Sequence, residues 1–203
     1  VDLYMFNRIQ NRGNTFAVKL MYLFEEKLFK SNIIGPRYKI RKDRYGPYNG
    51  EIRKDLENLV KMGYLKLDMI YYEKYDDTYN LYCKNNKTRR FLKEIDDLIK
   101  ENSIVFNIFD EIINEFGRYN GKVLKDYVYS LGKTGVRNKK MKNYRLNELV
   151  LDPLYLREPN FKFELDEDWY DTVEILLDPV LYQEHLNAIK DVREGNVLLY
   201  KPK

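Results

Sequence analysis

The sequence predicts a mostly α protein with one small β-hairpin and an extended helical arm at its C-terminal end. Apolar residues recur at helical spacing in several segments of the 203-residue chain. The pattern changes to alternation only in the stretch YLKLDMIYYEKYDDTYNLYCK, which is typical of a two-stranded ribbon. The net charge changes sign near residue 163, which separates a basic part of the chain from an acidic end.

Two helices and a loop are predicted before the ribbon. The helix FAVKLMYLFEEKLFK follows the turn NRGNT and is expected to be capped by Asn14 or Thr15. The helix GEIRKDLENLVKM is expected to begin after an Asn49 cap and to end at Gly63. The intervening IIGPRYKIRKDRYGPYNG contains Gly-Pro steps and predicts a loop with a short extended piece.

The ribbon is expected to turn at Asp76-Asp77, and further helices are predicted over 88–100, 103–117 and 122–131. Helix, loop, helix and two-stranded ribbon is the element order of a winged-helix module. Residues 1–131 are therefore expected to form a winged-helix-like helical domain with the hairpin as its wing.

The part of the chain up to residue 131 resembles the YwgA-like and Panacea group of small helical domains. The resemblance rests on Tyr45-Gly46-Pro47-Tyr48 and on the pattern of Asp55, Leu56, Leu59 and Gly63. It implies a helix, a loop with an aromatic-Gly-Pro turn, and a second helix that ends before a strand. Panacea domains occur in antitoxins of bacterial and phage toxin–antitoxin pairs. The four-residue motif by itself indicates a rigid turn, since proline fixes φ and glycine permits tight turns.

A basic and extended connector is predicted over residues 132–163. Its first part is rich in Lys and Arg without acids, and a second basic cluster lies in the loop ahead of the second helix. Such clusters can neutralise the phosphates of duplex DNA, although a solvated loop or a dock for the acidic end explains them equally well. The nucleic-acid-binding candidates are Arg37, Arg41, Lys42, Arg44, Arg137, Lys139, Lys140 and Lys142.

The acidic segment 164–203 predicts an amphipathic C-terminal arm of two helices. Ten acidic and four basic side chains give it a net charge of −6, whereas the rest of the chain carries +10. Asp166 or Asp168 is expected to cap the first helix, Asp178-Pro179 to separate the two, and Gly195 to end the second. The candidate partner-binding residues on its apolar stripes are Trp169, Val173, Leu176, Leu177, Leu181, Tyr182, Leu186 and Ile189.

The arm also resembles the neutralising tails of Phd/YefM-type antitoxins. Those tails begin with acids, continue as ET-x-E-I-L-x-DP-x-L and end in I-x-x-G-x-V. The matching positions are Thr172, Glu174, Ile175, Leu176, Asp178, Pro179, Leu181, Ile189, Glu194, Gly195 and Val197. The resemblance implies that an acidic, apolar segment wraps a small basic toxin protein. Docking of the arm on its own basic domain stays open as the alternative.

The composition predicts neither an enzyme nor a membrane-spanning protein. Cys83 and His185 are the only residues of their kinds, so neither a Cys or His metal site nor a His-based catalytic site is expected, and no cofactor is predicted. No apolar run approaches the roughly 20 residues that span a bilayer, so a cytoplasmic protein is expected. The 19 tyrosines, with abundant Lys, Glu and Ile, suggest a thermophile.

Two functions are carried forward from the sequence. The first is an antitoxin-like protein, not an enzyme, whose arm neutralises a toxin and whose basic domain also binds DNA as an autoregulator. The second is a stand-alone winged-helix transcriptional regulator whose tail forms a homodimer.

Overall fold

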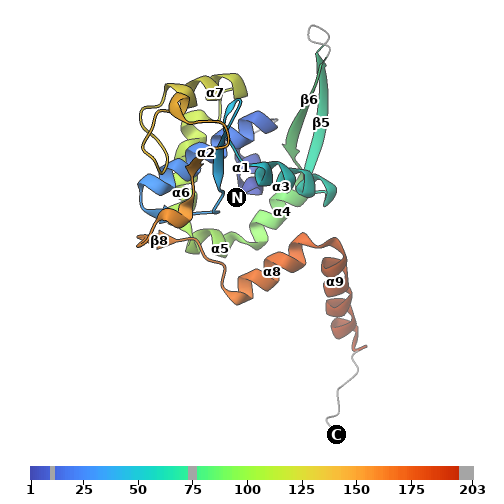
Figure 1. Cartoon of the computed structure of the whole chain (residues 1–203). Coiled ribbons are helices and arrows are strands. Elements are labelled where there is room, and N and C mark those ends of the chain that lie inside the picture. Colours follow the sequence, from blue (N-terminus) through green and yellow to red (C-terminus); the bar gives the residue numbers. More distant parts are fainter. Residues whose placement is uncertain (10–11, 73–76, 197–203) are drawn as a thin grey trace. The chain divides into compact units, whose positions relative to one another are not determined.

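The computed structural model describes residues 1–9, 12–72 and 77–196, and the chain falls into two compact units (Figure 1). The first unit, Val1–Glu164, is the body, and the second, Leu165–Lys203, is the arm. The described residues are mostly helical, and their small β-sheets all belong to the body. The expected mostly α class is confirmed.

Helices make up most of both units. Those of the body are α1 (Asp2–Arg8), α2 (Asn14–Lys30), α3 (Gly50–Lys61), α4 (Asn86–Glu94), α5 (Asp96–Glu101), α6 (Ser103–Phe116) and α7 (Gly121–Ser130). The arm contains α8 (Glu167–Leu177) and α9 (Pro179–Glu194). Two short 3-10 helices, Met141–Asn143 and Pro153–Tyr155, lie late in the body.

The strands of the body form three small sheets. They are β1 (Arg12–Gly13), β2 (Ile33–Ile34), β3 (Ile40–Asp43), β4 (Gly46–Tyr48), β5 (Leu65–Tyr72), β6 (Asp77–Lys84), β7 (Leu149–Leu151) and β8 (Phe161–Lys162). One antiparallel sheet has the order β1-β6-β5, a second has the order β4-β3-β7, and β2 pairs with β8 in parallel.

The core of the body is organised around α2, which contacts α6, α7 and α3 as well as several strands. Residues from Phe16 to Phe24 are buried around the whole helix, as expected for a helix that other elements enclose. The ring of Phe24 stacks on Phe109 of α6 with 4.3 Å between centroids. All buried apolar residues of the described chain lie in the body, which therefore has a core of its own.

α3 and the ribbon follow the sequence prediction closely. The Asn49 side chain accepts a hydrogen bond from the Glu51 backbone N–H, and Gly63 adopts φ of +73° just after the helix. Strands β5 and β6 pair antiparallel in continuous register from Leu65 opposite Lys84 to Tyr72 opposite Asp77. Of the two expected turn residues, Asp77 is instead paired opposite Tyr72 as the first residue of β6. Asp76 lies outside the described residues, as does Val197 of the arm.

Several local predictions are wrong. Helix α2 begins at Asn14 with Gly13 at the N-cap, so neither Asn14 nor Thr15 caps it. The helix expected over 88–100 is broken at Ile95, and α5 restarts there with Asp96 and Asp97 in its first turn, where acids suit the helix dipole. The segment expected to be mainly loop contains β2, β3 and β4, because β7 and β8 provide strand partners from more than a hundred residues away.

Candidate functional site

The two helices of the arm form as the sequence predicts. The Asp166 side chain accepts the Trp169 backbone N–H at 2.9 Å and so caps α8. The Asp178 side chain accepts the backbone N–H groups of Val180 and Leu181 at 2.8 and 3.1 Å, which caps α9 directly after the break. Gly195 ends α9 with φ of +75°. The arm is thus two short helices joined at the Asp178-Pro179 step, and the two helices contact each other.

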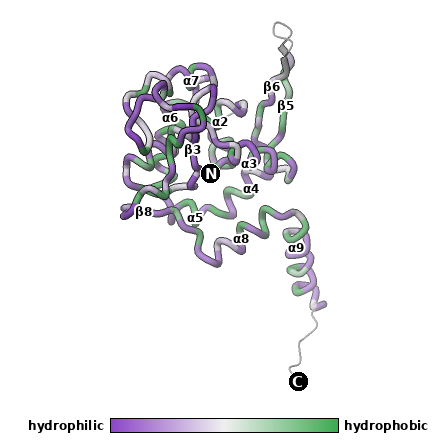
Figure 2. The backbone as a smooth tube through the Cα atoms, viewed as in Figure 1, coloured by the Kyte–Doolittle hydropathy of each residue, from purple (hydrophilic) through white to green (hydrophobic). Residues whose placement is uncertain are grey.

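Apolar side chains of the arm are not enclosed. Among the arm residues whose burial is described, none is buried, and Val180 and Val192 are 66% and 61% exposed. Of the predicted partner-binding residues, Leu181, Leu186 and Ile189 are exposed, and Trp169, Val173, Leu176, Leu177 and Tyr182 are half-buried. Figure 2 shows hydrophobic and hydrophilic positions alternating along α8 and α9. The arm therefore has amphipathic faces and no core of its own, and such faces are typical of interaction segments.

Part of the basic loop cluster lies on strand β3, which pairs with strand β7 just after the basic run of the connector. Strand β3 contains Arg41 and Lys42, and β7 pairs with it so that Arg41 lies opposite Leu149. The Lys42 backbone N–H donates to the Glu148 carbonyl at 2.8 Å, and Asn147 N–H donates to the Lys42 carbonyl at 2.7 Å. Part of the predicted connector is therefore built into the body rather than lying outside it.

Three of the predicted basic residues, on β3 and in the connector, have internal partners. Glu148 Oε1 lies 2.8 Å from Lys139 Nζ and 3.2 Å from Arg137 Nη1. The hydrogen bond from Lys139 is the main reason why the pKa of Glu148 is lowered. Lys42 is buried, and its Nζ donates to the Tyr129 hydroxyl at 2.9 Å. Lys42, Arg137 and Lys139 are therefore less available to a phosphate than the sequence suggests.

The remaining basic candidates are available at the surface. Arg41 is exposed, although its Nη1 donates to the Asn147 carbonyl at 3.0 Å. Within the described residues no ion pair involves the other exposed candidates, which are Arg37, Arg44, Lys140 and Lys142.

The Tyr45-Gly46-Pro47-Tyr48 motif is a turn that buried groups hold in place. Gly46 has φ of +102°, and a Cβ at this position would lie 3.2 Å from the ring of Tyr129. The buried Lys19 Nζ donates to the Pro47 carbonyl at 2.6 Å. The pKa of Lys19 is lowered to about 8, mainly by burial and also by the nearby ammonium groups of Lys42 and Lys125, while the carboxylate of Asp43 opposes the shift. These contacts support the architectural interpretation of the motif.

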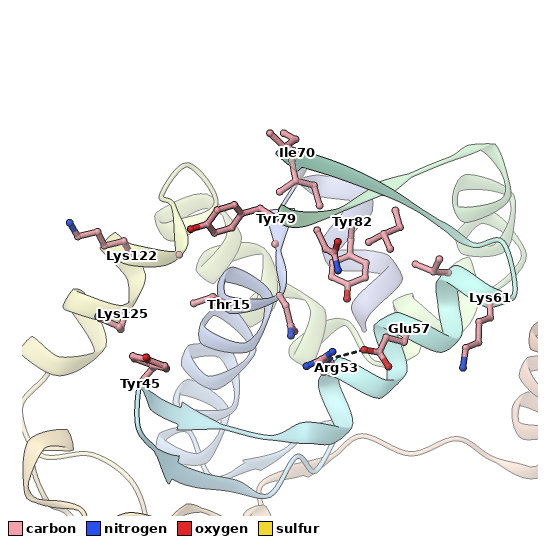
Figure 3. A pocket seen from close by; sticks show the side chains of 17 residues that line it. Thr15, Tyr45, Arg53, Glu57, Lys61, Ile70, Tyr79, Tyr82, Lys122 and Lys125 are labelled. Atoms are coloured by element: carbon pink, nitrogen blue, oxygen red, sulfur yellow. Dashed lines mark hydrogen bonds and ion pairs between the residues drawn. The ribbon is translucent and has the colours of Figure 1, made fainter. Parts of the chain in front are cut away.

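A groove in the body was not anticipated from the sequence. It has a volume of about 970 Å³ and lies between α3, the β5–β6 ribbon and the first turns of α7, with Tyr45 at one end (Figure 3). Lys61 of α3 and Lys122 and Lys125 of α7 line it. The sequence did contain a signal, because strand β5 has apolar residues on both faces, and Met69, Ile70 and Tyr71 are exposed.

Cys83 on β6 and His185 on α9 are the single cysteine and the single histidine of the sequence. The Cys83 thiol donates to Asp68 Oδ2 at 3.2 Å, and burial raises its pKa to about 11, so it is protonated at neutral pH. His185 is exposed on α9. In the described ranges, no group of three or more His, Cys, Asp or Glu side chains is arranged to hold a metal ion.

The longest helices of the described residues are α2, with 17 residues, and α9, with 16 residues. No helix in the described residues combines the length and apolar character needed to cross a bilayer.

Comparisons with known proteins do not assign the chain to a class. No family model, no curated protein and no solved structure matches it.

Proposed function

We propose that this chain is an antitoxin-like protein whose acidic arm binds and neutralises a small basic toxin protein. The observation that supports the proposal most strongly is the arm itself, which contains two well-capped helices but no buried described side chain. Helices of 11 and 16 residues are marginal in water without packing, so their apolar faces are expected to be completed by another surface.

The charge of the arm indicates what kind of surface this is. The described helix α8 and its cap contain five acidic side chains and no basic one, namely Asp166, Glu167, Asp168, Asp171 and Glu174. An acidic amphipathic helix is complementary to a basic protein with an apolar groove, and charge complementarity accelerates the encounter. The order of acids, Asp-Pro break and glycine stop resembles the neutralising tails of antitoxins, which supports a toxin as the partner.

A second candidate function is a winged-helix DNA-binding regulator whose tail forms a homodimer. The connectivity of the body favours it, because α1, β1, α2, α3, β5 and β6 occur in this order, with β2, β3 and β4 inserted between α2 and α3, and one sheet has the order β1-β6-β5. Without the inserted strands this order is the one expected of a winged helix, with α3 in the position of the recognition helix and β5–β6 as the wing. The exposed Arg37, Arg41, Arg44, Lys140 and Lys142 would provide the sequence-independent phosphate contacts.

Expression of the gene adjacent to the one encoding this chain tests the first proposal. That gene alone should arrest growth, and co-expression of the full chain should restore it. Leu186→Asp places a charge on the apolar stripe of α9, whereas Asn187→Asp places the same charge on the neighbouring polar face. Rescue should fail with Leu186→Asp and persist with Asn187→Asp.

The opposite outcomes separate the two candidates. Equal rescue by both variants, or by a chain lacking the arm, would contradict neutralisation through the arm. A purified chain of twice the 24.6 kDa monomer mass that becomes monomeric with Leu186→Asp would favour the dimeric regulator instead.

A further inference from the structure

The groove of the body has basic walls on two sides. Arg53 and Lys61 lie on α3, and Lys122 and Lys125 lie on the first turns of α7 (Figure 3). Glu57 is the one acid among the lining residues, and its Oε1 already lies 2.7 Å from Arg53 Nε. Lys61 and Lys122 are exposed, and neither takes part in an ion pair within the described residues. The groove therefore has an excess of positive charge, and a negatively charged ligand suits it.

The groove also has exposed aromatic surface beside the cations. Tyr45 at the β3–β4 turn is 61% exposed, and Lys125 Nζ lies 5.8 Å from its ring centroid. Tyr79 of β6 lies opposite Ile70 of β5, and both side chains are exposed at the groove. Flat tyrosine rings interspersed with lysines are the combination that binds unpaired nucleotides, because each base offers a π face and each linkage a charge.

Hydrogen-bonding groups complete the groove wall. Asn14 and Asn80 line it, and the Asn80 side chain is exposed, whereas the Oδ1 of Asn14 is buried and out of reach of a ligand. The exposed amide of Asn80 can pair with the edge of a base, which requires a base that is not already paired.

A duplex fits these features less well than a single strand. In a duplex the faces of the bases are stacked on one another, so tyrosines inside a concave groove cannot reach them. An acidic peptide would use the lysines, but it has no repeated flat face for the tyrosines. The combination of cations, exposed tyrosines and the exposed Asn80 amide favours unpaired nucleotides over both.

We propose that this groove binds a single-stranded oligonucleotide, with Lys61, Lys122 and Lys125 contacting phosphates and Tyr45 and Tyr79 stacking on bases. The proposal concerns the body alone and is independent of the partner of the arm. It also differs from duplex binding through the exposed basic residues of β3 and the connector, because those residues do not line the groove.

The test uses the full chain and fluorescein-labelled oligonucleotides, dT12 and rU12, in fluorescence anisotropy titrations at several salt concentrations. The double substitution Lys122→Gln and Lys125→Gln should raise Kd at least about tenfold and reduce the salt slope by about 1.4, or 0.7 for each lost phosphate contact. Tyr45→Ala should raise Kd about fivefold or more through lost stacking while the salt slope stays the same. Comparison of dT12 with rU12 shows whether the groove prefers DNA or RNA.

Controls make the expected result specific to the groove. Lys140→Gln with Lys142→Gln removes the same charge from another exposed part of the body and should change Kd less than about twofold. Thermal unfolding by circular dichroism checks that each variant is folded, and an exposed side chain such as Tyr45 can be removed without loss of the core.

Three results would overturn the proposal. The first is that neither single strand binds. The second is that a duplex of the same length binds as tightly as the single strand. The third is that the groove variants and the control variant lose the same amount of affinity. A hepta-glutamate peptide that binds the groove when the oligonucleotides do not would assign the groove to acidic peptides instead. Failure of the full chain to restore growth when the adjacent gene is expressed would leave this result unaffected, so the two proposals can fail separately.

Discussion

Replacement of Glu25 by Gln should make the stability of the body less dependent on pH. Glu25 lies on α2, is 1% exposed, and its Oε1 accepts the Tyr38 backbone N–H at 3.1 Å. Burial raises the pKa of this carboxyl from 4.5 to about 8, although hydrogen bonds from the backbone of Tyr38 and Arg37 oppose the rise. Gln keeps an acceptor for the Tyr38 N–H and has no charge to desolvate.

The sign of the effect follows from the protons bound in each state. Between pH 4.5 and about 8 the unfolded chain has released the Glu25 proton and the folded chain still holds it. The free energy of unfolding therefore falls as pH rises through this window. With a Glu25 pKa of about 8 in the folded state and 4.5 in the unfolded state, the free energy of unfolding of the parent should fall by about 2.5 kcal/mol relative to that of Glu25→Gln between pH 5 and pH 7.

Urea unfolding monitored by circular dichroism at pH 5, 6 and 7 measures the difference. Glu94→Gln, at an exposed position of α4, is the control for the loss of one carboxyl and should track the parent at every pH. The reasoning is refuted if the difference between Glu25→Gln and the parent is the same at pH 5 and at pH 7.

Three further predictions concern the turn and the boundary of the body. Lys19 has a pKa lowered to about 8, so above that pH the unfolded state binds more protons at this group than the folded state does. From pH 8 to pH 9.5 the free energy of unfolding of the parent should therefore rise by about 1.5 kcal/mol relative to that of Lys19→Met, measured by the same unfolding curves. Gly46→Ala places a Cβ against the ring of Tyr129 at a backbone φ of +102° and should lower the free energy of unfolding by about 1–3 kcal/mol. Gly132→Ala, with open space around the added Cβ, should leave the stability in thermal melts nearly unchanged. Removal of Leu165–Lys203 should change the free energy of unfolding of the body by less than about 0.5 kcal/mol, because every buried apolar residue of the described chain lies outside the arm. A large loss of cooperativity of unfolding on truncation would contradict this prediction.

The elements that local sequence signals specify were predicted well. Asn49 and Gly63 delimit α3, and Asp178-Pro179 separates α8 from α9, because caps, prolines and glycines act on the backbone within a few residues. The amphipathic faces of the arm were recognised for the same reason, since helical spacing is a local property.

Features that depend on distant partners were not predicted. The pairing of β3 with β7 joins segments about a hundred residues apart, and no local pattern in either strand specifies the other. The same pairing brings Glu148 to Lys139 and Arg137, which a count of basic residues along the chain could not anticipate. Burial of Lys42 beside Tyr129 is likewise a consequence of tertiary packing. The groove draws its lining from α3, α7 and both strands of the ribbon, and therefore exists only once the body has folded.

Calorimetric titration of the full chain into the purified product of the adjacent gene tests the central claim most directly. If the arm binds a basic toxin through its apolar stripe, the two proteins should form a complex. Leu186→Asp should then weaken the complex by about 2 kcal/mol or more, while Asn187→Asp should change it by less than about 0.5 kcal/mol. A complex that tolerates Leu186→Asp as well as Asn187→Asp, or that persists after removal of Leu165–Lys203, would contradict the account.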